Sequence, residues 1–263
     1  VNNIVLRNHI ASPMRCNEHN LASEINRISE AFKTSESLDA NAWVNSLYKP
    51  TPMIIEAAQA LYAGHDVREI SHKESDDNDI AVTTACIDEI IETVNHFRCI
   101  DYVIDHAIEK INESHIKQLH AILKTNTSDS QKDWFAVGAY KKLANEVGGE
   151  PTIQPADVQQ EMRVLLTKYH AQEKIDLDAI LDFHVRFERI HPFQDGNGRV
   201  GRLLMFWQCL QNGVTPFIVT EDLRLYYYRG LQNWGQVNGF LRDTILTAQD
   251  MFEDVMIYFG IKK

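Results

Sequence analysis

The feature that most constrains this chain is a polar, glycine-rich loop between two apolar segments with helical spacing. Its chemistry-bearing residues are one histidine, one aspartate, an asparagine between two glycines and two arginines: His191, Asp195, Gly196, Asn197, Gly198, Arg199 and Arg202. Glycine-rich backbone at the start of a helix exposes N–H groups that bind phosphates, and arginine adds forked, permanently charged donors. A carboxylate beside phosphates usually binds Mg²⁺, which needs only one or two protein oxygens, and a histidine can deprotonate a hydroxyl. The loop therefore predicts a site that holds a phosphate chain beside a general base.

The apolar spacing around this loop predicts an all-α chain. The expected helices cover residues 87–109, a segment capped by Ser114, a segment that starts at Pro155, residues 176–190, a segment that begins at Asn197-Gly198 and runs to Asn212-Gly213, a segment capped by Thr220, and residues 239–258. Two short extended arms, at residues 135–140 and 147–153, predict a small β-hairpin. His191 should end the helix that leads into the loop, because a residue before proline is pushed out of the helical region. The predicted architecture is a helical bundle around a helix–loop–helix core.

Residues 1–70 and 71–263 are expected to have different roles. Helical spacing recurs near residues 21–32 and 54–63, so residues 1–70 are predicted to form a helical arm that regulates activity or selects a target. Residues 71–263 contain the loop and are predicted to be the catalytic domain with its C-terminal helices. The polar stretch at residues 71–79 is interpreted mainly as a solvated loop.

The composition favours a soluble, cytoplasmic protein with no nucleic-acid or membrane partner. The chain has 263 residues, 44% of them hydrophobic, which is enough for a sizeable core. A net charge of -11, from 26 basic and 37 acidic residues, argues against the extended basic face that such partners need. The four cysteines show no Cys-x-x-Cys pairing, which indicates reduced thiols in a reducing compartment. The longest apolar run, at residues 203–210, is too short to span a bilayer, and the N-terminus shows no signal-peptide pattern.

The loop resembles the signature of the Fic family. The segment His191-Pro192-Phe193-Gln194-Asp195-Gly196-Asn197-Gly198-Arg199-Val200-Gly201-Arg202 matches His-x-Phe-x-Asp/Glu-Gly-Asn-Gly-Arg-x-x-Arg at every fixed position. So many specified residues at fixed spacing rarely coincide by chance. The similarity extends over residues 86–235, through the segments 182–188, 138–141 and 95–97.

This resemblance implies a helical Fic fold with a small hairpin flap over the active-site loop. It also implies an enzyme that transfers AMP from ATP to a Ser, Thr or Tyr hydroxyl of a target protein or of the chain itself. Carried over by position, the roles are general base for His191, Mg²⁺ binding for Asp195, the anion pocket for Gly196, Asn197 and Gly198, phosphate binding for Arg199 and Arg202, and anchoring of the nucleotide loop for Phe193. Members that phosphorylate instead carry a lysine within the glycine segment, so the intact Gly198 favours AMP transfer. The chemistry agrees, because phosphoryl-type transfer needs positioning and charge neutralisation more than covalent catalysis.

Further assignments depend on the same resemblance. Residues 136–153 fall where the family has its flap, which implies a docking edge for an extended segment of the target protein. Tyr227, Tyr228 and Trp234 fall near the expected adenine position, and the two tyrosines are expected to bind nucleotide. A run of tyrosines on a helix more often packs internally, so that alternative stays open. A homodimer formed through N-terminal helices also stays open.

Self-inhibition is where the sequence departs from the family. Many members carry an inhibitory helix, Ser/Thr-x-x-x-Glu-Gly/Asn, whose glutamate pairs with the second arginine of the signature, here Arg202. In the best matching stretch, Asp77-Asn78 stand for the Glu-Asn pair and Lys73 occupies the Ser/Thr position. An aspartate is one methylene shorter than a glutamate, so we expect self-inhibition to be weak, absent or supplied by another chain.

Two other functions and one other site are compatible with these residues. A nucleotide-sensing interaction module without turnover would keep the loop, as would Fic-type transfer of another phosphate-containing group. The presence of both His191 and Asp195 favours an enzyme, because a binding module has no use for a base. His184 and Glu188, one helical turn apart, resemble half a metal site, but no third ligand shares their spacing. They are therefore interpreted as a hydrogen-bonded core pair.

Overall fold

The computed structural model describes residues 84–258, which form a helical domain. Seven α-helices lie within these residues: α6 (Thr84–Asp105), α7 (Glu113–Lys124), α8 (Pro155–His170), α9 (Leu177–Ile190), α10 (Asn197–Asn212), α11 (Arg224–Asn233) and α12 (Gly239–Tyr258). A two-stranded hairpin and two 3₁₀ turns, η2 (Ser128–Gln131) and η3 (Glu221–Leu223), connect them. The predicted all-α fold is confirmed. The predictions for residues 1–70 and 71–79, including the domain boundary and the role of Asp77, lie outside the described residues.

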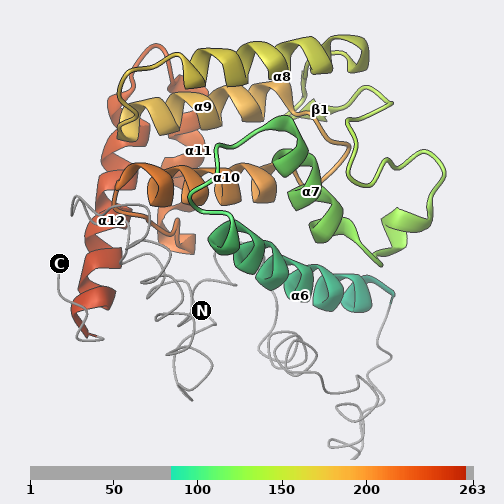
Figure 1. Cartoon of the computed structure of the whole chain (residues 1–263), viewed down its shortest axis with the longest axis horizontal. Helices are drawn as coiled ribbons and strands as arrows, with labels where there is room; N and C mark the ends of the chain where they lie inside the picture. Colours follow the sequence, from blue (N-terminus) through green and yellow to red (C-terminus); the bar gives the residue numbers. More distant parts are fainter. Residues whose placement is uncertain (1–83, 259–263) are drawn as a thin grey trace, which may run out of the picture.

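Helix α10 lies inside the bundle, where it packs against α9, α6 and α7 (Figure 1). Helix α8 packs against α9, and α11 packs against α12. The buried apolar residues of α10 are Val200, Leu203, Leu204, Met205, Trp207, Cys209 and Leu210. A helix with buried residues on so many sides belongs to the core of a domain. The loop that precedes α10, residues 191–196, is therefore attached directly to the core.

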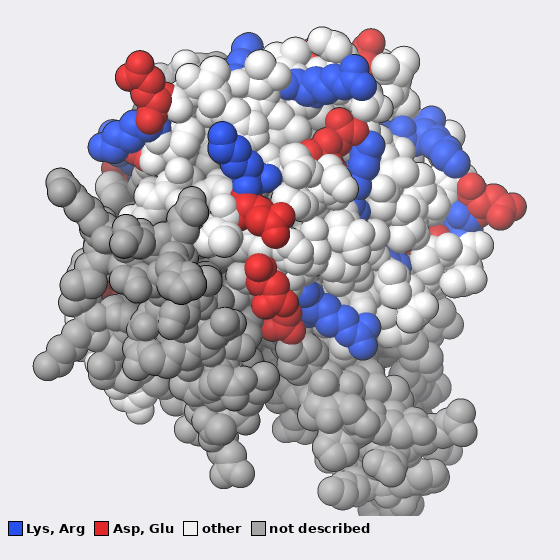
Figure 2. Space-filling view, viewed as in Figure 1, with Lys and Arg blue, Asp and Glu red and all other residues white. Residues whose placement is uncertain are grey.

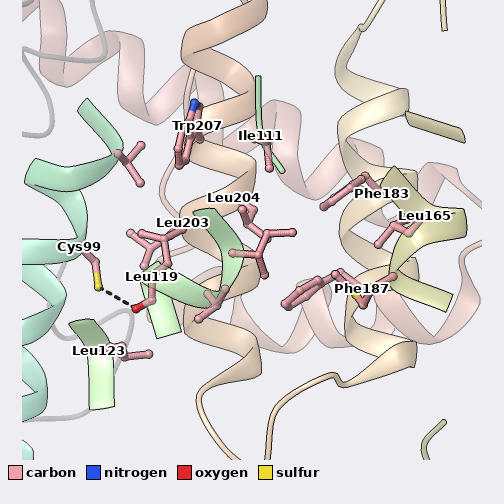
Figure 3. Close-up of a cluster of buried hydrophobic side chains, with 14 of the residues drawn as sticks. Cys99, Ile111, Leu119, Leu123, Leu165, Phe183, Phe187, Leu203, Leu204 and Trp207 are labelled. Carbon is pink, nitrogen blue, oxygen red and sulfur yellow. Dashed lines mark hydrogen bonds between the residues drawn. The ribbon is translucent and has the colours of Figure 1, made fainter. Parts of the chain in front are cut away.

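The main core connects α10 to α7 and α9 through close apolar packing. Figure 3 shows Leu203 and Leu204 of α10 between Leu119 of α7 and Phe187 of α9. The Cys99 thiol of α6 donates to the carbonyl oxygen of Leu119 at 3.4 Å. Burial of each leucine or phenylalanine stabilises the fold by about 1.5–3 kcal/mol. Because α7 and α10 share this core, side chains on α7 keep a fixed position relative to the start of α10.

Two of the predicted helix caps are wrong. Helix α7 is capped by Asn112, whose Oδ1 accepts a hydrogen bond from the backbone N–H of His115 at 3.0 Å. Ser114 lies in the first turn of that helix instead. Asparagine and serine cap equally well, so their preferences could not decide between two positions so close together. Thr220 precedes the 3₁₀ turn η3 without a side-chain cap bond, and α11 begins only at Arg224.

Other predicted helix ends are confirmed. Helix α8 begins with Pro155 in its first turn. A backbone N–H at this position has no partner within the helix, so proline, which has no N–H, costs no hydrogen bond there. Helix α9 ends at Ile190, immediately before His191-Pro192. Helix α10 ends at Asn212 and is capped by Gly213, which has a left-handed backbone with φ 64°. The two helices that enclose the loop therefore have the boundaries that the sequence indicated.

The β-hairpin is shorter than expected and lies entirely within the second half of the predicted region. Its strands β1 (Glu146–Val147) and β2 (Glu150–Pro151) are antiparallel. Residues 148–149 are glycines with positive φ, as a tight hairpin turn requires. The predicted first arm, residues 135–140, is wrong. Gly138 has φ 68° and its N–H is bonded to a side chain of α7, so the chain turns there and makes no strand ladder.

The described surface carries mixed charge. On the described part of the face in Figure 2, Lys and Arg side chains lie close to Asp and Glu side chains. Among residues 84–258, no helix combines the length and the apolar character needed to cross a membrane. The described cysteine side chains, Cys99 and Cys209, are buried thiols, and burial raises the pKa of each.

Candidate active site

The loop between α9 and α10 turns through two left-handed residues. His191 follows α9 with φ 51° and ψ 61°, and Gly196 precedes α10 with φ 82°. A left-handed conformation is uncommon for a histidine and is costly unless surrounding contacts impose it. Asn197 provides such contacts: its Oδ1 accepts from the Phe193 N–H and its Nδ2 donates to the Phe193 carbonyl, both at 2.8 Å. Phe193 is fully buried, so the loop is fixed to the core from within.

The ring of His191 is oriented by the backbone of α9. Its Nδ1 lies 3.3 Å from the carbonyl oxygen of Glu188. Because a carbonyl oxygen only accepts, Nδ1 carries the proton and Nε2 keeps its lone pair. Burial lowers the pKa of His191 below the ordinary value of 6.5, and the charge of Lys141 lowers it further. At neutral pH the ring is therefore neutral, which is the form that can accept a proton.

Asp195 lies at the N-terminus of α10 in contact with two cations. Its Oδ2 is 2.7 Å from Nζ of Lys124 and 3.0 Å from Nη2 of Arg199. Partial burial would raise the pKa of this carboxyl group, but Arg199 and Lys124 outweigh it and lower the pKa to about 2. The side chain is half exposed. Asp195 is therefore an ionised and accessible oxygen ligand at neutral pH.

Glu92 and Lys124 complete an ion cluster that the sequence did not predict. The Lys124 side chain is 1% exposed, and its Nζ contacts Glu92 and Asp195 and lies 3.3 Å from Asp129. Glu92 also pairs with Nη1 of Arg199. Burial alone would lower the pKa of Lys124, but Asp195 and Glu92 outweigh it and raise the pKa. We call Glu92, Lys124, Asp195 and Arg199 the loop ion cluster.

Arg202 adjoins a buried polar group contributed by α9 and α11. Nε2 of His184 lies 2.5 Å from the hydroxyl of Tyr227, and Oε1 of Glu188 lies 4.0 Å from the same nitrogen. Burial and the charge of Arg202 lower the pKa of His184 to about 3. Burial raises the pKa of Glu188 to about 7, although Arg202 opposes this shift. Among the described residues no His, Cys, Asp and Glu side chains group as a metal site, so His184 and Glu188 lie together in the core with Tyr227 as the hydrogen-bond partner of the histidine.

Two of the three aromatic residues predicted near an adenine are enclosed. Tyr227 is 3% exposed, and Trp234 is buried and donates from Nε1 to Asp182 Oδ1 at 3.1 Å. The burial of Tyr227 contradicts its predicted stacking on a nucleotide, because packing covers its ring. Tyr228 is 51% exposed. Of the two tyrosines, Tyr228 alone offers an accessible ring.

The segment that leads into the hairpin is tied to the loop by Lys141 and Asn145. The Lys141 N–H donates to the carbonyl oxygen of Pro192 at 2.8 Å, and the Asn145 amide donates to that of Phe193 at 3.0 Å. The Lys141 ammonium donates to Asn145 Oδ1 and to Thr152 Oγ1, each at 2.6 Å. Burial lowers the pKa of Lys141 to about 8. The segment on both sides of the hairpin therefore has a fixed position against the loop.

The loop also fits a metal that arrives with phosphates. Mg²⁺ prefers oxygen ligands and commonly takes one or two carboxylates, with waters and substrate phosphates as the other ligands. Asp195 offers one ionised, half-exposed carboxylate at a helix N-terminus. Among the described residues no three His, Cys, Asp or Glu side chains group as a metal site, so the fit is to Mg²⁺ bound jointly by Asp195 and a nucleotide.

Sequence comparison shows which proteins the domain is similar to. The model of the Fic/DOC family matches residues 110–209 of the chain. The "Protein adenylyltransferase Fic" of Drosophila virilis is 29% identical over 149 residues, which cover 53% of this chain and 31% of that protein. Its counterpart in Drosophila ananassae is 28% identical over 149 residues and is covered to 30% of its length. The chain thus spans about a third of the length of the curated relatives that it matches.

Structural comparison gives the same fold. A Fic domain-containing signalling protein of Bacteroides thetaiotaomicron aligns with a TM-score of 0.60 at 19% identity, covering 96% of this chain and 92% of that one. Residues 134–508 of Fic-1 from C. elegans align with a TM-score of 0.55 at 16% identity, covering 92% of this chain and 72% of that one. The predicted Fic fold is confirmed. Residues 110–209 thus match the model of the Fic/DOC family, and the described domain has the fold of solved Fic proteins.

Proposed function

We propose that this protein transfers AMP from ATP to a hydroxyl group of a protein side chain. The observation that carries the proposal is the orientation of His191. Its Nδ1 is turned to the carbonyl oxygen of Glu188, so Nε2 is the nitrogen that can accept a proton. Asp195 of the loop ion cluster lies on the same short loop and pairs with Arg199. The curated relatives of this chain are named protein adenylyltransferases, which supports AMP transfer.

In the proposed reaction, the hydroxyl oxygen of the target attacks the α-phosphorus of ATP. The new oxygen–phosphorus bond forms as the bond to the β-phosphate oxygen breaks, and pyrophosphate leaves. The hydroxyl proton goes to Nε2 of His191, which is neutral at neutral pH because burial lowers its pKa. The reaction needs no covalent enzyme intermediate, so positioning and charge neutralisation supply most of the acceleration.

The loop is expected to supply this positioning. Gly196, Asn197 and Gly198 lie at the start of α10, where backbone N–H groups and the helix dipole attract an anion. Arg199 and Arg202 add forked donors for the phosphate oxygens. Mg²⁺ bound at Asp195 would neutralise phosphate charge.

The hairpin is the proposed docking edge for the target protein. Strands β1 and β2 are exposed, and the segment around them is tied to the loop through Lys141 and Asn145. An extended segment that pairs with an exposed strand gains main-chain hydrogen bonds. Such pairing would place a target hydroxyl beside His191.

Incorporation of labelled ATP tests this function. The chain and a cell lysate are incubated with Mg²⁺ and ATP labelled either at the α-phosphate or at the γ-phosphate. We expect protein-bound α-label with the wild type, none with His191→Ala, and unchanged incorporation with the matched control His170→Ala at the exposed end of α8. Label in neither the wild type nor the control would refute AMP transfer. ATP binding without label would indicate a nucleotide-sensing module, and γ-label alone would indicate phosphorylation.

A further inference from the structure

His120 of α7 lies between two segments that are far apart in the sequence. The side chain is fully buried, and its ring stacks on Phe193 with centroids 4.0 Å apart and an interplanar angle of 1°. On one side it meets Gly138, where the segment toward the hairpin begins, and on the other Asp195 in the loop. These two contacts span 18 and 75 sequence positions.

Both ring nitrogens of His120 are used, and the backbone fixes their roles. The Gly138 N–H donates to Nδ1 at 3.0 Å, so Nδ1 is the unprotonated nitrogen. Nε2 lies 3.2 Å from the carbonyl oxygen of Asp195, which only accepts, so Nε2 carries the proton. The opposite tautomer would lose both hydrogen bonds. His120 therefore acts as an acceptor for one segment and a donor for the other.

The bond to Asp195 also sets the direction of the next backbone N–H. A trans peptide is planar, and its C=O and N–H point to opposite sides. With the Asp195 carbonyl held by Nε2 of His120, the direction of the Gly196 N–H is fixed as well. That N–H is hydrogen-bonded to the Asp195 carboxylate, which is the oxygen ligand of the proposed site. The orientation of His120 is thus linked to the carboxylate through one rigid peptide.

The contact with Gly138 fixes the beginning of the flap segment. Gly138 has φ 68°, and a Cβ at this position would lie 2.9 Å from Cβ of Ala121, the residue after His120. Glycine permits this close approach and the left-handed backbone. From Gly138 the chain continues to Lys141, whose N–H donates to the carbonyl oxygen of Pro192 in the loop.

We propose that His120 is a positioning residue that holds the phosphate-binding loop with Nε2 and the beginning of the flap with Nδ1. This rests on the proposed function, in which the loop binds nucleotide and the flap binds the target. The two ring nitrogens therefore serve two different substrates. Loss of one bond should affect one substrate site and leave the other intact.

Two amide variants separate the bonds. In His120→Asn, the side-chain oxygen can replace Nδ1 as acceptor for the Gly138 N–H, while nothing reaches Asp195. In His120→Gln, the longer amide N–H₂ can replace Nε2 as donor to Asp195, while the Gly138 bond is lost. Exchange of the Gly138 amide proton reports on the flap, and the chain has only 12 glycines, so ¹⁵N-glycine labelling gives a simple spectrum. Titration with ATP and Mg²⁺ reports on the loop.

We expect opposite effects of the two variants. A typical hydrogen bond corresponds to about 3- to 10-fold in an equilibrium constant. His120→Asn should therefore weaken ATP binding by about that factor and leave Gly138 exchange within about 2-fold of the wild type. His120→Gln should speed Gly138 exchange by about the same factor and leave ATP binding within about 2-fold. His115→Gln, in the same helix but away from the loop, should change neither quantity.

A shared response would overturn the proposal. If both variants altered both quantities, or if neither variant altered either, the two nitrogens would have no separate roles. Gly138→Ala supplies a second perturbation if the histidine variants fail to fold: it should loosen the flap and leave ATP binding within about 2-fold. A decrease in ATP affinity in Gly138→Ala as large as that in His120→Asn would also contradict the proposal. Because neither readout depends on AMP transfer, the result is separate from the test of the proposed reaction.

Discussion

Replacement of Lys124 by methionine tests how strongly the loop ion cluster stabilises the domain. Methionine keeps most of the volume and removes the charge. Nζ of Lys124 is buried against Glu92 and lies 2.7 Å from Asp195 and 3.3 Å from Asp129, so the substitution leaves three carboxylates without this cation. Removal of one partner of a buried ion pair costs about 3–5 kcal/mol, because the remaining charge stays buried. Glu92 keeps its contact with Arg199, and Asp195 is half exposed, so we expect the lower end, about 3 kcal/mol.

Urea unfolding of Lys124→Met and of Lys132→Met measures this difference. Lys132 is the matched control: its Nζ lies 2.6 Å from Asp129, but its side chain is 46% exposed. An exposed pair of this kind contributes less than about 1 kcal/mol. For a chain of this size, about 3 kcal/mol corresponds to a decrease in Tm of about 6–12 °C. Equal losses in the two variants, within about 0.5 kcal/mol, would refute the argument that burial makes the cluster strong.

Three further outcomes follow from the site. The charges of Arg199 and Lys124 outweigh burial and depress the pKa of Asp195 to about 2, below its unfolded value of about 3.9. Its stabilising contribution is therefore present above pH 4 and is lost as the pH falls toward 2. The free energy of unfolding of the Lys124→Met variant should fall less steeply over that range. If His191 is the base, kcat/KM for AMP transfer should decrease only as the pH falls through a value below 6.5. A decrease in kcat/KM that is centred above pH 6.5 would contradict this. Gly201→Ala should destabilise the fold by about 1–3 kcal/mol in urea unfolding, since its Cβ would lie 2.5 Å from Glu188 Oε1.

The loop could be predicted from the sequence because its chemistry is local. His191, Asp195 and Arg199 lie within one short segment, and Pro192 and the glycines determine how that segment leaves and enters a helix. The structure places these residues together as expected. Residue types, their order and their spacing were enough, without knowledge of the rest of the fold.

The partners of the loop could not be predicted in this way. Lys124 is 71 positions from Asp195, and Glu92 is 107 positions from Arg199. A lysine in the last turn of a helix normally interacts with the helix C-terminus in solvent, so Lys124 gave no sign of burial. His120 likewise occupies one position in a helix whose other buried residues are ordinary core residues. Only the packing of α7 and α6 against α10 brings these side chains to the loop.

In the hairpin region, the sequence predicted more strand than the fold contains. Both arms have apolar and β-branched residues, and strand propensity alone could not separate them. The bond from Gly138 to His120 and the bond from Lys141 to Pro192 take up backbone N–H groups that a strand would need for its ladder. Tertiary contacts to the site thus shorten the hairpin, and such contacts cannot be predicted from a sequence pattern.

The position of Arg199 follows from the same long-range contacts. Its two terminal nitrogens contact Glu92 and Asp195, so the guanidinium is held before any phosphate is present. A donor that is already oriented needs no reorganisation when charge develops nearby, and this is how a fixed polar site stabilises a transition state better than water does. Glu92 and Lys124 also keep opposite charges paired around the loop, which lets two cations and two carboxylates share a partly buried space. The signature residues supply the reacting groups, and α6 and α7 supply the fixed electrostatic surroundings in which those groups can act.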